Sequence, residues 1–149
     1  MSGESDFIDL MRQMAHDPAA RGLDDDVAVV SVGDETLILT HDMIVEGVHY
    51  LPTDPPEDVA WKLVAVNLSD LAGKGARPLG ALLGYALSES DWDRAFAKGL
   101  ATALTAFAMP LLGGDTVAMP AGAPRTLGLT AVARARGRAP ARAAARPTD

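Results

Sequence analysis

Residues 27–40, VAVVSVGDETLILT, consist of two runs rich in β-branched residues on either side of Gly33-Asp34. Short β-rich runs that flank a Gly-Asp pair are typical of a β-hairpin. The stretch therefore predicts two antiparallel strands joined by a tight turn. The second run continues into residues 39–52, LTHDMIVEGVHYLP, where an aspartate, a glutamate and two histidines interrupt an apolar pattern. Groups that resist burial, at the end of a core segment, need a chemical reason to be there.

The segments around this hairpin predict a mixed α/β domain. Apolar residues recur at helical spacing after Ser5, and Asp17-Pro18 ends that pattern. A longer helix begins at Pro55-Pro56 and runs until Gly73 and Gly75 stop it. Further predicted elements are a strand over residues 78–87, a helix over 91–108, and strands over 109–114 and 125–134. The predicted order is αββαβαββ.

Composition limits the classes of protein that are plausible. A chain of 149 residues with 48% hydrophobic residues is long enough for one domain with a substantial core. It has no cysteine, which excludes disulfides, zinc-thiolate sites, iron–sulfur clusters and a cysteine nucleophile from these residues. The N-terminal sequence MSGESDFIDL is acidic, and no apolar run is long enough to cross a bilayer. We therefore expect a cytoplasmic protein without a membrane partner.

The net charge of −7 hides an uneven distribution along the chain. Residues 1–124 carry 19 acidic and 7 basic side chains, whereas residues 125–149 carry 6 arginines and 1 aspartate. A nucleic-acid binder needs basic surface on its folded part, so the composition argues against that class. An acidic body that handles a phosphorylated ligand would need divalent cations to mediate the contact.

Acidic residues recur at four points relative to the predicted elements. Asp25 and Asp26 precede a strand, Asp42 follows one, Asp70 lies late in the long helix, and Asp115 follows the strand at PLLGG. We expect these loci to converge at one edge of the sheet. Magnesium prefers octahedral oxygen coordination at about 2.0–2.1 Å, so such carboxylates would suit several Mg²⁺ ions that hold a nucleotide triphosphate.

Each locus also has a structural interpretation. Asp25 and Asp26 could be turn residues, and Asp70 could form an i,i+4 ion pair with Lys74 on the helix surface. GGDT could be an ordinary tight turn, and His49 a loop histidine with no ligand. The common phosphate-binding and hydrolase motifs GxxxxGK[ST], GxGxxG, HExxH and GxSxG are all absent from the sequence. Nucleotide binding would therefore need another device.

Taken in order, four stretches resemble the N-terminal half of the thiamine-monophosphate kinase family. They are DDDVAVV (24–30), LTHDMIVEGVHYLP (39–52), WKLVAVNLSDLAGKGARP (61–78) and LLGGDT (111–116). The resemblance runs from about Phe7 to Asp149, and EGVHYLP and VNLSDLAGKGA are its most specific parts. The wider superfamily includes aminoimidazole ribonucleotide synthetase and selenophosphate synthetase.

The resemblance implies a fold and partners. It implies an α/β domain with a four-stranded mixed sheet, helices on one face, and a homodimer in which the sheets of two subunits pair. Residues 1–133 would form the N-terminal domain that binds ATP and Mg²⁺. Residues 134–149 would be an arginine-rich linker towards a second domain that lies outside this sequence. The implied reaction transfers the γ-phosphoryl group of ATP to thiamine monophosphate and gives thiamine diphosphate.

The resemblance also implies roles for particular residues, none of them an acid or base. Metal ligands would be Asp26, Thr40, His41, Asp42, Asp70 and Asp115. His49 would contact the substrate, and Gly114, Asp115 and Arg142 would contact ATP.

This chain departs from the family pattern at two positions. Asp24 replaces the glycine of the usual GDDA, and His41 stands where the family usually has threonine or serine. Imidazole is a poor ligand for magnesium, so residue 41 would serve a metal best through its backbone carbonyl. Two alternatives remain open: a superfamily member with another acceptor, or a non-catalytic module that binds nucleotide or dimerises.

Overall fold

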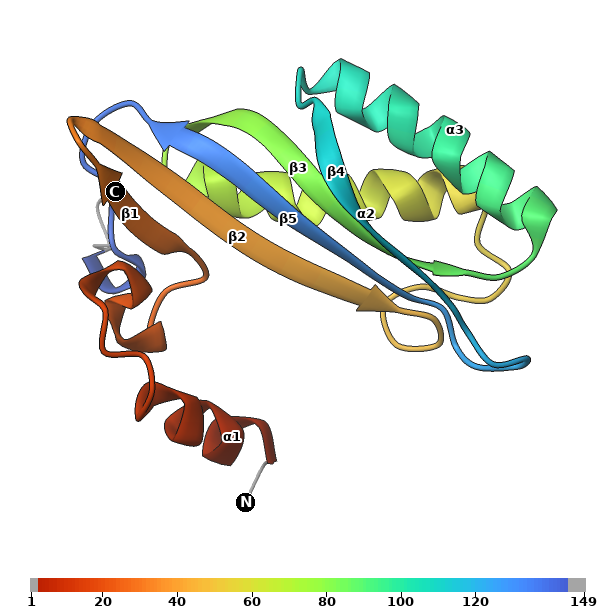
Figure 1. Ribbon diagram of the computed structural model, residues 1–149, viewed down its shortest axis with the longest axis horizontal. Helices are drawn as coiled ribbons and strands as arrows, with labels where there is room; N and C mark the ends of the chain where they lie inside the picture. The colour runs from red at the N-terminus through yellow and green to blue at the C-terminus, as the bar shows by residue number, and fades with distance from the viewer. Residues whose placement is uncertain (1–2, 145–149) are drawn as a thin grey trace.

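The structure, a computed structural model, describes residues 3–144, which form one open sheet with helices (Figure 1). The strands are β1 (Ala28–Val32), β2 (Glu35–Val45), β3 (Ala76–Leu87), β4 (Leu111–Ala118) and β5 (Thr126–Ala135). The helices are α1 (Gly3–Arg12), α2 (Pro56–Gly73) and α3 (Ser90–Ala106), with short 3₁₀ helices η1 (Pro18–Leu23) and η2 (Arg142–Ala144). The strand order is β1-β2-β5-β3-β4, and β3 and β4 are the one parallel pair among them.

The sheet has five strands, so the four-stranded sheet implied by the family resemblance is wrong for this chain. The fifth strand is β1, which is short but pairs with β2 along its whole length, from Ala28 opposite Leu39 to Val32 opposite Glu35. Gly33 has a φ of 57° in the two-residue turn, a backbone conformation that glycine adopts without steric cost. The predicted hairpin is therefore confirmed.

The core lies between one face of the sheet and two helices. Helices α2 and α3 lie side by side, and α2 runs across β2, β5 and β3 (Figure 1). Alternate residues of the central strands, such as Ile38, Leu127 and Leu129, are buried against these helices. Phe96 of α3 packs on Tyr85 of β3, with ring centroids 5.0 Å apart. The period-2 pattern of the strands thus meets the period-3.6 pattern of the helices in one core.

The opposite face of the sheet carries apolar side chains that no described helix covers. The register places Met43, Gly128, Gly84 and Asp115 in one row across the sheet, and Leu82 opposite Thr130 in the next row. Met43 and Leu82 are about half exposed. Helix α1 stands apart from the sheet beside η1, and its residues Phe7 and Leu10 are also exposed (Figure 1).

The long helix is confirmed at both of its predicted ends. Pro55 precedes α2, which begins at Pro56, and the helix ends at Gly73. Gly75 follows with a φ of 61°, which directs the chain into β3. None of the helices in the described part of the chain combines the length and apolar character needed to cross a membrane.

The contact between α2 and α3 depends on Gly99. A Cβ atom at this position would lie 2.4 Å from the Cα of Glu57, so the two helices could not approach as closely. We expect Gly99→Ala to lower the free energy of unfolding by about 1–3 kcal/mol, the usual cost of overpacking a core. Thermal unfolding followed by circular dichroism would measure it.

Gly73→Ala is the matched control. Nothing lies within 4 Å of a Cβ at Gly73, and alanine favours the helix. We therefore expect an unchanged or slightly higher melting temperature for the control. Equal melting temperatures for the two variants would contradict this account of the helix contact.

Candidate functional site

Thr40 joins three segments of the chain at one side of the sheet. It is a buried residue of β2, and its side-chain oxygen lies 2.7 Å from a carboxylate oxygen of Asp70 on α2. The same hydroxyl lies 3.3 Å from the backbone carbonyl oxygen of Asp26, just before β1. The shorter contact is a charge-assisted hydrogen bond donated to a carboxylate, which is the stronger kind. Thr40 therefore fixes Asp70 beside the Asp26 main chain.

Asp42 lies two residues further along β2, on the same face of the strand as Thr40. Its backbone N–H donates to the side-chain oxygen of Asn67, 3.3 Å away, and Asn67 in turn donates to the carbonyl of Leu63 at 3.0 Å. Asn67 is fully buried in the helix face that meets the sheet. This amide therefore ties β2 to α2 at the level of Asp42.

The carboxylates of Asp70 and Asp26 lie close enough to act on the carboxylate of Asp42. Burial raises the pKa of Asp42 above its usual value, the negative charges of Asp70 and Asp26 raise it further, and His41 opposes the shift. A site that disfavours its own negative charge favours a bound cation. Thr40, Asp42 and Asp70, with Asp26 before β1, are thus brought together.

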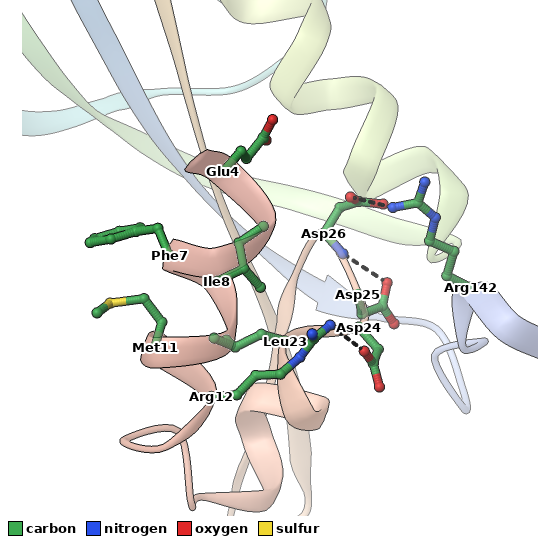
Figure 2. A pocket seen from close by; sticks show the side chains of 10 residues that line it. All are labelled: Glu4, Phe7, Ile8, Met11, Arg12, Leu23, Asp24, Asp25, Asp26 and Arg142. Atoms are coloured by element: carbon green, nitrogen blue, oxygen red, sulfur yellow. Dashed lines mark hydrogen bonds and ion pairs between the residues drawn. The ribbon is translucent and has the colours of Figure 1, made fainter. Parts of the chain in front are cut away.

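Arg142 supplies a positive charge to this group. Its guanidinium nitrogen lies 3.0 Å from a carboxylate oxygen of Asp26, and both side chains are more than half exposed. Figure 2 shows Arg142 reaching Asp26 from the C-terminal segment, with α1 on the other side of the cavity. That cavity, of about 570 Å³, is lined by Glu4, Phe7, Ile8, Met11, Arg12, Leu23, Asp24, Asp25, Asp26 and Arg142.

Asp115 does not join the other carboxylates. It lies inside β4, opposite Gly84, and the register places it on the face of the sheet that the helices leave open. His41 also points to that face, where its Nδ1 lies 2.8 Å from the hydroxyl oxygen of Thr130. His41 borders two hollows, one shared with Asp26 and Thr40 and the other shared with Asp115.

The strand ends differ from the sequence-based expectation. Asp42 and Asp115 were expected to follow strands, yet β2 runs to Val45 and β4 to Ala118, so both lie within strands. A carboxylate that projects from a sheet face leaves the backbone free to pair, and pairing therefore continues past it. Among residues 3–144, no three or more His, Asp or Glu side chains lie close enough together to coordinate a metal ion.

Position 114 requires glycine because the backbone of the neighbouring strand leaves no room for a side chain. A Cβ atom there would lie 1.9 Å from the carbonyl oxygen of Leu83 on the neighbouring strand. Any other residue would push β4 away from β3. The contact of Gly114 with a nucleotide stays a prediction.

His49 is held by its own loop. Its Nδ1 accepts a hydrogen bond of 3.0 Å from the backbone N–H of Val45, and its carbonyl accepts one from Lys62. The exposed ring therefore has Nε2 left for a ligand. Its role in substrate binding stays a prediction.

The sequence-family model for the N-terminal domain of AIR synthase related proteins matches residues 24–135. The chain belongs to this family. Thiamine-monophosphate kinase of Salmonella typhimurium is 41% identical over 131 residues, which cover 86% of this chain and 39% of that protein. The chain thus spans about two fifths of the length of this curated relative.

Two solved structures of similar fold support this family assignment. One, described as AaThiL complexed with AMPPCP and TMP, has a TM-score of 0.79 and 29% identity over 89% of this chain and 42% of that one. The other, thiamine monophosphate kinase from Aquifex aeolicus, has a TM-score of 0.76 and 25% identity over 90% of this chain and 44% of that one. Both therefore share the fold of most of this chain.

The family domain contains features that the sequence reasoning missed. Lys74 does not pair with Asp70, because its amine bonds to the carboxylate of Asp25, to which Arg21 also donates. Burial raises the pKa of Asp25, but the hydrogen bonds from Lys74 and Arg21 outweigh it and hold the pKa below its usual value.

Asn67 is a second residue of the site that the sequence analysis did not identify. The sequence does contain a signal for it, because Asn67 lies three residues before Asp70 and so shares its helix face.

Asp42→Asn should stabilise the protein at neutral pH when no divalent cation is present. Because the folded state raises the pKa of Asp42, the ionised carboxylate destabilises the fold at neutral pH. The advantage of Asn should shrink as the pH falls through the raised pKa and protonates Asp42. Thermal unfolding in EDTA across that pH range would measure it.

Asp34→Asn is the control, since Asp34 occupies the hairpin turn, where asparagine is equally suited. A fall in the melting temperature of Asp42→Asn at neutral pH, with the control unchanged, would contradict the repulsion inferred for Asp42.

Proposed function

We propose that this chain is the N-terminal portion of an ATP- and Mg²⁺-dependent kinase that phosphorylates thiamine monophosphate to thiamine diphosphate. The observation that carries the proposal is the group of Asp26, Asp42 and Asp70 around Thr40, with Arg142 beside it. The likeness to thiamine-monophosphate kinases and to AaThiL complexed with AMPPCP and TMP supports it.

The carboxylates suit magnesium in kind, because they offer hard oxygen donors whose mutual repulsion a divalent cation would relieve. Asp26, Asp42 and Asp70 would hold it, with Thr40 orienting Asp70. Bound magnesium would neutralise the charge of two anions, ATP and the substrate phosphate, that otherwise repel each other. We propose that Asp115 and His41 also bind magnesium, from the hollow that these two residues share on the open face of the sheet.

Arg142 and His49 would contact the ligands. The guanidinium of Arg142 now pairs with Asp26, and a phosphate group would compete for it with the geometry that arginine prefers. Nε2 of His49 and the backbone at Gly114 would contact the substrate and the nucleotide. No side chain is assigned as acid or base, because in-line transfer between phosphates needs positioning and charge neutralisation above all.

Binding of Mg-ATP should depend on the carboxylates. We expect titration calorimetry to detect Mg-ATP binding by the unaltered chain and an affinity at least about tenfold lower for Asp42→Asn, because a metal ligand is lost. Asp115→Asn tests whether the second hollow belongs to the same site, and Asp34→Asn is the control. Equal affinities in all four proteins would reject the nucleotide site.

The acceptor is tested by ADP release. Thiamine monophosphate should stimulate ADP formation in the protein that includes this chain, and a panel of other phosphorylated acceptors should not. Stimulation by a different acceptor would favour another superfamily activity. Binding of Mg-ATP without turnover on any acceptor would favour a nucleotide-binding module.

We also propose that a second copy of the chain covers the open face of the sheet. The exposed apolar residues Met43, Leu82 and Val117 lie on that face, and such a patch is typical of an interface. Met43→Glu should shift the protein from dimer to monomer in analytical ultracentrifugation. Lys98→Glu, on the exposed side of α3, is the control, and a monomeric unaltered chain would reject the interface.

A further inference from the structure

A buried ionic cluster lies directly behind the carboxylate site. Asp25 is 3% exposed in its side chain and accepts from Arg21 at 2.7 Å and from Lys74, whose side chain is 8% exposed. Two cations thus surround one anion. A buried cluster with surplus positive charge needs further acceptors for its remaining N–H groups.

Those acceptors come from the other end of the chain. We call residues 139–142 the C-terminal arm. Arg21 donates to the carbonyl of Ala139 at 2.9 Å and to that of Pro140 at 3.0 Å, and Lys74 donates to Pro140 at 3.2 Å. Ala139 is itself buried in the core. The arm is therefore held at two successive carbonyls and one side chain.

Arg142 follows this anchor by two residues and reaches Asp26. The pair between Arg142 and Asp26 is largely exposed, and exposed pairs contribute little to stability. It is too weak to order the arm by itself, whereas the buried cluster is well placed to do so. Arg21 also adopts a φ of 50°, an unfavourable backbone conformation for a residue with a side chain, which its hydrogen bonds help to offset.

We propose that Arg21, Asp25 and Lys74 form a clamp that anchors the C-terminal arm and thereby positions Arg142 at the carboxylate site. The part of this proposal that concerns nucleotide rests on the proposed function. Lys74 is a positioning residue, because it acts on the ligand through Arg142. The clamp explains why a lysine is buried at the end of α2.

Lys74→Met tests the clamp, because it removes the cation and keeps a side chain of similar length. We expect trypsin to cleave the native variant after Arg138 roughly tenfold faster, since cleavage follows the population of the open arm. Mass spectrometry would identify the cut. Lys98→Met, on the exposed side of α3, is the matched control, and Lys74→Arg should restore slow cleavage.

Mg-ATP affinity supplies the second measurement. Lys74→Met should weaken binding as much as Arg142→Ala does, and the double variant should be no weaker than either, because both act through one group. If Lys74→Met fails to fold, Arg21→Gln removes the hydrogen bonds to the carbonyls of Ala139 and Pro140 instead. Additive losses, or an affinity equal to that of the Lys98→Met control, would overturn the positioning role.

The two proposals fail in different ways. If the unaltered chain does not bind Mg-ATP, the proposed function is rejected, and the cleavage assay still decides on the anchor. Cleavage after Arg138 at the rate of the Lys98→Met control would overturn the clamp, whatever the nucleotide result.

Discussion

Burial of the Asp42 carboxylate beside the charges of Asp70 and Asp26 is the constraint around which this domain is arranged. The fold brings them together from before β1, from β2 and from α2, although the charges oppose it. Hydrophobic contact between α2 and the sheet supplies the free energy that holds them there. The charged carboxylates thus lower the stability of the fold, and the hydrophobic core offsets that loss. A bound cation would relieve the repulsion.

Polar side chains set the geometry within that constraint. Thr40 orients the Asp70 carboxylate, and Asn67 fixes the backbone at Asp42. Both are buried polar residues, and each has its hydrogen-bonding partners. The geometry of the site therefore rests on main-chain and neutral side-chain contacts, which do not depend on the charge of the carboxylates.

Local signals in the sequence predicted most of the elements. The turn at Gly33-Asp34 and the helix between Pro55-Pro56 and Gly73 are encoded by neighbouring residues, and both are confirmed. The face on which Asp115 lies depends on the register of β4, which shifts at Ala81 and Leu82 and leaves no mark in the sequence. The bond between Lys74 and Asp25 joins residues 49 positions apart, so the nearer Asp70 was the natural but incorrect partner.

Strand β4 has a consequence that does not depend on metal binding. All eight of its residues are exposed, and Asp115 is its one charged side chain. A strand at the margin of a sheet can recruit other chains through its unpaired backbone groups, and a charge within it opposes such growth. We therefore expect the charge of Asp115 to oppose pairing of β4 with other chains, so an Asp115 variant should be less soluble even where its ligand affinity is unchanged.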